Sequence, residues 1–448
     1  MSLSLLLCLL AFTFCYVAGR RSLVDGLVAV LGIGYFYGIT KANLADTTSN
    51  FIFDAGVVGL YATQLFRPLN ALQKTRVEAL RSWMEVLMLW ALLIFFLPAQ
   101  DLVIRLVGLR PSIFFLPFLL LGARLLPEER YKLALCLAVL NLTALAFAVG
   151  EFMLGVPAFF PRNQMTKIIY ASKDVLGADT LYRIPACFAN AHAYGGTMVA
   201  TVPFIAGAFL QKHKHQWQLY LLVTGLATAL LGVLLSATRV NFVAIAILIL
   251  VLTFSIKSRI GYAFGWIVIL AAIGLFAAGE ARLQRVAELQ NTEYVKERVV
   301  GSVNMTFFEL AAQYPFGNGL GGGGSSIPYF LQGQIRNPVV MENEYARIML
   351  EQGIFGLCLW IAFIVWLASR YKGSRSDSWR QGRFLAWCGC MISFGIGLLG
   401  IGLFASVPQT CIVLMTAGWV AAREPTPVPE REKQTAAHEF KTAQQLPT

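Results

Sequence analysis

The sequence predicts an all-α integral membrane protein, and three observations support this fold class. Of the 448 residues, 57% are hydrophobic and only 13% are charged, whereas soluble domains carry about 25% charged residues. The mean hydropathy is +0.65. Apolar runs of about 20 residues, long enough to cross roughly 30 Å of hydrocarbon, recur along the chain without strand-like alternation. These properties exclude a soluble enzyme, a disordered chain and a fibrous repeat, and they favour a helical bundle over a transmembrane β-barrel.

About 12–13 transmembrane helices are expected, in a single polytopic membrane domain over residues 1–422. The first run could be mistaken for a signal peptide, but Arg20 and Arg21 follow it rather than precede it, so we interpret it as a membrane segment. The runs at 51–66 and 112–126 are short, which leaves the total open by one or two. The thirteen expected segments are 2–18, 22–39, 51–66, 83–99, 112–126, 133–155, 191–211, 219–238, 240–256, 260–279, 345–369, 384–406 and 409–422.

The distribution of lysine and arginine predicts the orientation in the membrane. A net charge of +12 would suggest a nucleic-acid partner for a soluble protein, but here the positive-inside rule accounts for it. Alternate short connections are basic, beginning with Arg20 and Arg21, and the short connections between them hold only Lys41 and the pair Arg105 and Arg110. The pattern predicts an outer N-terminus, a cytoplasmic C-terminus and no nucleic-acid partner.

Two longer stretches fall on the predicted outer side. Residues 156–190 form a mixed polar loop, and residues 280–341 form a large loop with helical periodicity of its own between the tenth and eleventh segments. The large loop contains the glycine run 321–324, which is either a flexible linker or part of a functional loop. The polar tail 423–448 is expected to be disordered.

Two arginines stand close to membrane depth on the outer side. Arg183 precedes the seventh segment, and Arg239 interrupts nearly continuous apolar sequence after Thr238. An arginine at this depth costs roughly 2.5–3.5 kcal/mol on insertion scales, which favours a function for it. The alternatives are a snorkelling side chain at a helix end and a shared anion site, because guanidinium groups match phosphate oxygens bidentately.

A second polar cluster opens the eleventh segment. Glu342 and Asn343 stand where a helix N-cap is expected, and acidic residues are favourable at that end. Arg347 and Glu351 continue down an apolar helix at a spacing of four residues, which a mutual ion pair would explain. Cysteine and histidine show no metal-ligand spacing, so neither a metal nor a disulfide framework is expected.

Four separated motifs together resemble the O-antigen ligase and O-antigen polymerase family of bacterial envelope glycan assembly. The resemblance covers about residues 180–360, and the hydropathy profile extends it over the whole chain. The motifs are Arg183 with Phe188-Ala189-Asn190-Ala191, then Ser236-Ala237-Thr238-Arg239, then Tyr314-Pro315-Phe316-Gly317-Asn318-Gly319-Leu320, and finally Asn343-x-Tyr345 with Glu351-x-Gly353-Ile354-x-Gly356-Leu357.

The resemblance implies a type C glycosyltransferase-like protein of the bacterial inner membrane, with a periplasmic N-terminus. Its donor would be a polyprenyl-pyrophosphate-linked glycan, with no cofactor and no metal; membrane lipid and a chain-length regulator or flippase would be further partners. Arg183 and Arg239 would bind the pyrophosphate. Glu342 stands where the ligases have a catalytic His, which favours a polymerase or another exopolysaccharide-assembly member over a ligase. The candidate substrate-binding residues are Asn343, Tyr345, Arg347 and Arg298.

Alternatives remain open at this point. His192, at the start of the seventh segment, is a second candidate for the base. A ligase, a polysaccharide or lipid transporter and a non-catalytic scaffold are the competing functions, because intramembrane arginine and glutamate also occur in transporters.

Overall fold

The computed structural model describes residues 2–170, 182–255, 293, 296, 307–324, 327–339, 343–371, 379–400 and 402–422. All regular elements among these residues are helices, which confirms the all-α fold class. The helices are α1 Leu3–Arg21, α2 Leu23–Leu44, α3 Ile52–Gln64, α4 Ala71–Phe95, α5 Leu102–Leu109, α6 Phe118–Arg124, α7 Pro127–Leu154, α8 Lys167–Tyr170, α9 Ala191–Phe209, α10 Gln216–Ser236, α11 Arg239–Ser255, α15 Phe307–Gln313, α16 Glu344–Ser369, α17 Arg380–Ile396 and α18 Gln409–Ala421.

Six of the described helical stretches are long and apolar enough to cross a membrane, which supports a membrane-embedded protein. They are Leu3–Arg21, Leu23–Leu44, Leu102–Arg124, Pro127–Leu154, Gln216–Ser236 and Glu344–Ser369. Two shorter apolar helices, Arg239–Phe254 and Gln409–Ala421, accompany them. The expected segment 260–279, the tail 423–448 and most of the loop 280–306 lie outside the described residues.

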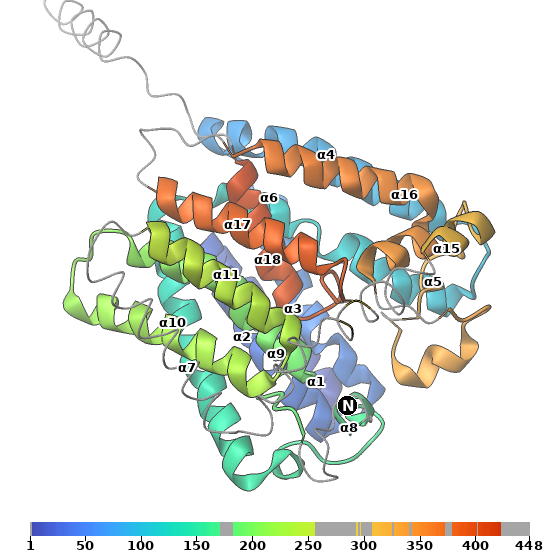
Figure 1. Cartoon of the computed structure of the whole chain (residues 1–448), viewed down its shortest axis with the longest axis horizontal. Coiled ribbons are helices and arrows are strands. Elements are labelled where there is room, and N and C mark those ends of the chain that lie inside the picture. The colour runs from blue at the N-terminus through green and yellow to red at the C-terminus, as the bar shows by residue number, and fades with distance from the viewer. Residues whose placement is uncertain are drawn as a thin grey trace, which may run out of the picture.

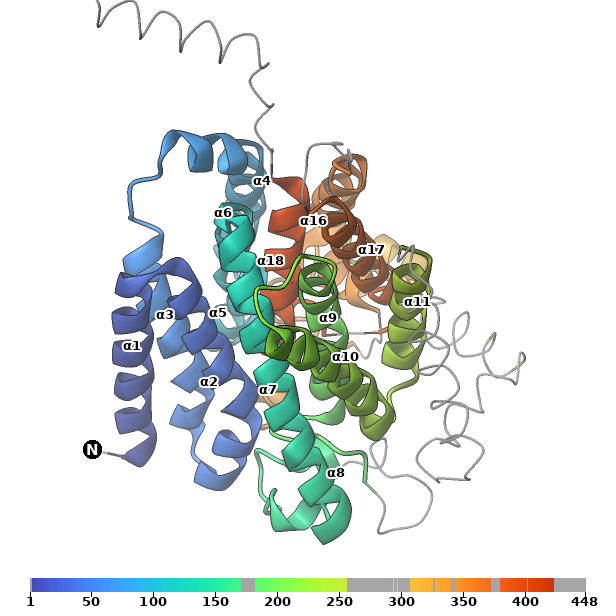
Figure 2. The ribbon, with the colours of Figure 1, turned by 90° about the vertical axis from the view of Figure 1, so that its left-hand side faces the viewer.

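The helix α9 is the centre of the bundle. Nearly all of its residues are buried, and it packs against α7, α10, α11, α17 and α18. The helices α1, α2 and α3 form a separate flank beside this core (Figure 2). The helix α15 packs against α16 and lies near α5 on the right in Figure 1.

Several expected boundaries differ from the structure: α4 begins twelve residues before the expected segment 83–99, and α17 ends ten residues before the end of the expected segment 384–406. The expected segment 112–126 begins ten residues earlier, at Leu102, and a π-helical turn, η2 Arg110–Phe114, interrupts it. Arg110 therefore lies within an apolar helical stretch rather than in a connection between two segments. The Asp54 carboxylate accepts two hydrogen bonds from Arg110 at 2.8 and 2.7 Å, so this charge is compensated inside the bundle.

Glycine allows close contact between α6 and α18. A Cβ atom on Gly418 would lie 2.0 Å from the Leu119 carbonyl oxygen, and one on Gly122 would lie 2.1 Å from the Met415 carbonyl oxygen. The backbones of these helices therefore approach at positions where any side chain would overlap with main chain.

Replacing Gly418 with Ala is expected to lower the free energy of unfolding by about 1–3 kcal/mol, because the added methyl group overpacks the α6–α18 contact. The matched control is Gly32→Ala in α2, where a Cβ atom meets nothing within 4 Å. The control should be neutral or slightly stabilising, since Ala favours helix. Unfolding of the purified protein in detergent checks both variants, and equal stabilities would contradict the close packing described here.

Candidate active site

The segment before α9 carries Arg183 and is held by its backbone. Ile39 of α2 donates its N–H to the Cys187 carbonyl oxygen at 3.1 Å. Ala186 has a left-handed φ of 51°, and its N–H donates to the Glu151 carboxylate at 3.0 Å. Burial raises the pKa of the Cys187 thiol, with a smaller contribution from Glu151, so Cys187 is a neutral packing group rather than a nucleophile.

Arg183 is buried, and it contacts the predicted alternative base. Its Nη1 lies 2.9 Å from Nε2 of His192, which is in the first turn of α9. Because arginine is always a donor, Nε2 of His192 accepts this hydrogen bond. Asn190 caps the helix by accepting a hydrogen bond from the Ala193 N–H at 2.8 Å. The segment thus places a guanidinium group at the N-terminal end of the central helix.

The motif that ends in Arg239 forms the α10–α11 turn and meets the start of α9. Oγ of Ser236 and Oγ1 of Thr238 are 2.9 Å apart, and Asn241 donates to Thr238 at 2.9 Å and to the His192 carbonyl oxygen at 3.4 Å. Arg239 is half-buried and is the first residue of α11. The structure therefore brings the segments of Arg183 and Arg239 to adjacent helix N-termini.

Gly195 makes this arrangement possible. A Cβ atom on Gly195 would lie 2.6 Å from Ser236 Oγ, 2.7 Å from Thr238 Oγ1 and 2.9 Å from Asn241 Nδ2. The polar turn packs directly against the α9 backbone, a contact that no larger residue would leave in place.

The start of α16 contains a buried charge cluster of three residues. Arg347 donates to Glu344 at 2.8 and 2.5 Å and to Glu351 at 2.5 Å, and the exposed fractions of Glu344, Arg347 and Glu351 are 0%, 1% and 0%. The Gly402 N–H donates to Glu344 at 2.7 Å. The expected pairing of Arg347 with Glu351 is therefore present, but Glu344 joins it, so that among the described residues two carboxylates share one cation.

The remaining residues expected at this end are placed as follows. Asn343 is the N-cap of α16, as predicted, and its Oδ1 accepts from the N–H groups of Tyr345 and Ala346 at 2.8 and 3.2 Å. The Tyr345 hydroxyl donates to the Phe394 carbonyl oxygen at 2.7 Å. The candidate base Glu342 and the candidate substrate-binding Arg298 lie outside the described residues.

The motif at 314–320 and the glycine run fold onto α16. Helix α16 is broken at Gly353, where φ is 72° and ψ is 178°. The freed Leu350 carbonyl oxygen accepts from the Asn318 N–H at 2.5 Å, and the freed Ile354 N–H donates to Pro315 at 3.0 Å. Turn 315–318 thus replaces the helical hydrogen bonds that the break removes.

The glycine run itself is a packed turn. Leu320 and residues 321–323 are buried. The Gly323 N–H donates to Glu351, and a Cβ atom on Gly323 would lie 3.0 Å from Arg347 Cγ. Of the two interpretations of the run, a flexible linker does not agree with this packing.

Sequence reasoning missed Glu151. It is 1% exposed near the C-terminus of α7, where it holds the Arg183 segment through Ala186. The sequence does contain a signal for Glu151, because a carboxylate within the apolar run 133–155 is costly to bury and usually has a role.

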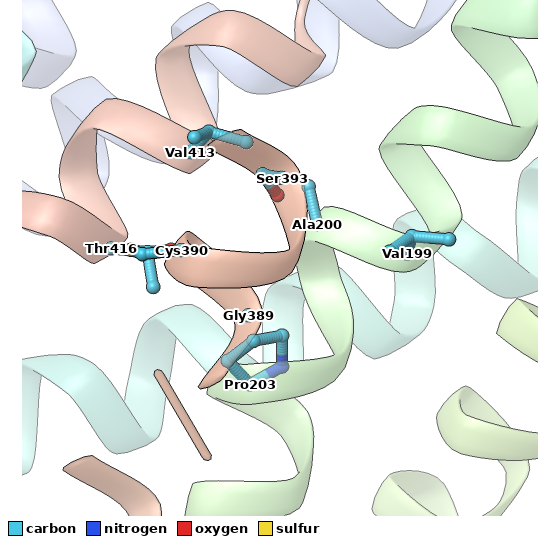
Figure 3. Close-up of a pocket in the computed structure, with 8 residues that line it drawn as sticks. All are labelled: Val199, Ala200, Pro203, Gly389, Cys390, Ser393, Val413 and Thr416. Atoms are coloured by element: carbon cyan, nitrogen blue, oxygen red, sulfur yellow. The ribbon is translucent and has the colours of Figure 1, made fainter. Parts of the chain in front are cut away.

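A small pocket lies further along α9, between this helix, α17 and α18 (Figure 3). Its lining is small or apolar and contains no charged side chain, so it does not extend the polar site. Its lining residues are Val199, Ala200, Pro203, Gly389, Cys390, Ser393, Val413 and Thr416. Among the described residues, no three His, Cys, Asp or Glu side chains gather to hold a metal ion.

Neither a scan against protein-family models nor a search of curated proteins finds a match to this sequence.

Proposed function

We propose that the protein is a membrane glycosyltransferase that polymerises or transfers a polyprenyl-pyrophosphate-linked oligosaccharide at the outer face of the bacterial inner membrane. The observation that carries the proposal is the convergence of the Arg183 segment, the start of α9 and the Arg239 turn at one end of the bundle. Helix N-termini present N–H groups and positive potential, and guanidinium groups match phosphate oxygens bidentately. This combination is suited to a pyrophosphate at the membrane interface.

In the proposed reaction, a hydroxyl oxygen of the acceptor sugar attacks the anomeric carbon of the donor. The bond from that carbon to the pyrophosphate oxygen breaks, and its electron pair leaves on the pyrophosphate. The anomeric configuration inverts in this single displacement. Arg183 and Arg239 stabilise the charge that develops on the leaving group, a role that needs no proton donor.

The acceptor proton goes to a base, and Glu342 is the preferred candidate. In the sequence it directly precedes Asn343, the N-cap of α16. His192 is less suited, because the lone pair of its Nε2 already accepts from Arg183. A carboxylate serves as base when its surroundings keep it poorly solvated.

The proposed topology has 12–13 spans with a periplasmic N-terminus. The alternation of basic connections supports it. In this orientation the described parts of the loop 280–341, the Arg239 turn and the start of α16 share the periplasmic side.

A transporter is the second candidate function, and the break in α16 is the observation that favours it. Discontinuous helices form the substrate sites of many transporters. Here, however, turn 315–318 forms hydrogen bonds with the backbone groups that the break at Gly353 frees, and the break lies in the N-terminal half of the helix. Because these backbone groups are already hydrogen-bonded within the protein, the break leaves fewer of them for a substrate than a transport site requires.

Arg239→Lys is expected to lower polymer formation about tenfold or more, because a single ammonium group cannot reproduce bidentate contacts to phosphate. The measurement is polymer formation in a strain that depends on the introduced gene, at matched protein levels. Arg81→Lys is the control, since Arg81 is exposed and pairs with Glu85. Normal polymer from both Arg239→Lys and Arg183→Lys would remove the pyrophosphate role.

A further inference from the structure

Glu151 is a buried carboxylate that the proposed reaction does not use. It lies in the last turn of α7 and is 1% exposed, within a helix long and apolar enough to cross a membrane. Its Oε2 accepts a hydrogen bond from the Ala186 N–H at 3.0 Å, and its Oε1 has no hydrogen-bond partner among the described residues. A carboxyl group is costly in such surroundings, so we expect its contact with Ala186 to have a role.

The contact stabilises an unfavourable backbone conformation. Ala186 has a φ of 51°, in the left-handed region that residues other than glycine rarely adopt. It is also fully buried, so its N–H group needs an acceptor within the protein. The Glu151 side chain supplies that acceptor from a neighbouring helix, and the sequence around Ala186 contains no glycine that would make the turn easy.

The conformation at position 186 determines where Arg183 lies. Only two residues separate the two positions: Ile184, which is fully buried, and Pro185, whose ring fixes φ. On the other side of the segment, Ile39 of α2 donates its N–H to the Cys187 carbonyl oxygen at 3.1 Å. The segment is therefore held between α2 and α7, and a shift at position 186 would move the Arg183 side chain.

We propose that Glu151 is a positioning residue for Arg183. By accepting the hydrogen bond from Ala186, it sets the place of the Arg183 guanidinium group at the candidate pyrophosphate site. This inference rests on the proposed function. The role needs an acceptor oxygen at the reach of a glutamate side chain, and it does not need a negative charge. A displaced guanidinium group would lose its bidentate geometry to phosphate and with it part of the stabilisation of the leaving group.

Turnover of the lipid-linked donor by purified variants in liposomes, per folded protein, tests the inference. Glu151→Leu should lower turnover about tenfold or more, because the buried Ala186 N–H loses its acceptor. Glu151→Gln should retain most of the activity, since its amide oxygen reaches the same N–H. Glu151→Asp keeps the carboxylate but shortens it by one methylene group, and it should lower turnover.

The matched control is Glu129→Leu. Oε2 of Glu129 accepts a hydrogen bond from the Leu126 N–H at 2.8 Å, so the same kind of contact is removed at the other end of α7. This variant should turn over normally. If the effect of Glu151 passes through Arg183, Glu151→Leu should cause no further loss in an Arg183→Ala background. A purely structural role would lower turnover by the same factor in both backgrounds.

Two results would overturn this inference and leave the proposed function standing. One is an impaired Arg183→Ala together with a normal Glu151→Leu. The other is an inactive Glu151→Gln together with an active Glu151→Asp, which would assign the role to the charge; this comparison also decides the matter if Glu151→Leu does not fold. Normal turnover of Arg183→Ala would instead contradict the proposed function, because it would remove the pyrophosphate role of Arg183.

Discussion

Glu342→Gln is expected to lower turnover by about 10²–10⁴, the usual contribution of a general base, while folding and donor binding stay nearly intact. The amide is close in size to the carboxylate but cannot take the proton of the acceptor hydroxyl. If the Glu342 carboxylate only stabilises the N-terminal end of α16, Glu342→Gln should lower the free energy of unfolding by about 1 kcal/mol and leave turnover unchanged. The measurement is consumption of the lipid-linked donor by purified variants with equal unfolding temperatures.

Three further variants complete this comparison. Glu309→Gln is the control, because Glu309 is an exposed carboxylate in α15 of the large loop, and this variant should turn over normally. Glu342→His should retain part of the activity, since an imidazole can accept the same proton. Normal turnover of Glu342→Gln together with an inactive His192→Ala would identify His192 as the base and contradict our assignment.

Arg347→Met is expected to lower the free energy of unfolding by about 3–5 kcal/mol, the largest stability effect we predict. The substitution leaves two buried carboxylates, Glu344 and Glu351, without their shared cation. The start of α16 and the glycine turn should loosen together, because Glu351 also accepts from Gly323. Chemical unfolding in detergent measures the change.

The control for this prediction is Arg81→Met, which breaks an exposed pair with Glu85 and should cost less than about 1 kcal/mol. The triple variant Glu344→Gln, Arg347→Met, Glu351→Gln should recover part of the lost stability, because it removes the unpaired charges. Wild-type stability of Arg347→Met would contradict a structural role for this cluster.

The sequence predicts helices well where continuous apolar character decides the structure. The expected segments 191–211 and 345–369 correspond to α9 Ala191–Phe209 and α16 Glu344–Ser369, and the cap at Asn343 was predicted from its side chain. The start of the expected segment 112–126 was wrong, because Asp54 compensates the charge of Arg110 inside the bundle and lies 56 residues earlier in the sequence. Such pairing between distant residues leaves no periodic signal.

Individual residues of the candidate site were predictable from the sequence, but the contacts between them were not. The two arginines stood out because apolar sequence surrounds them, and Arg347 with Glu351 followed from helical spacing. The third member of that cluster, Glu344, and the packing of Gly323 on Arg347 depend on how distant segments fold over α16. The same applies to Glu151, which supports the Arg183 segment through a backbone N–H.

Reconstitution tests directly whether the protein transfers the lipid-linked glycan. The purified protein in liposomes is supplied with a polyprenyl-pyrophosphate-linked oligosaccharide from the outside and no nucleotide sugar, and released polyprenyl pyrophosphate and glycan length are measured together. We expect a longer or transferred glycan and free polyprenyl pyrophosphate in equal amounts, and we expect Arg183→Lys and Arg239→Lys to reduce both. Movement of the intact lipid-linked donor across the bilayer, with no glycan transfer, would contradict the proposed function and establish a transporter.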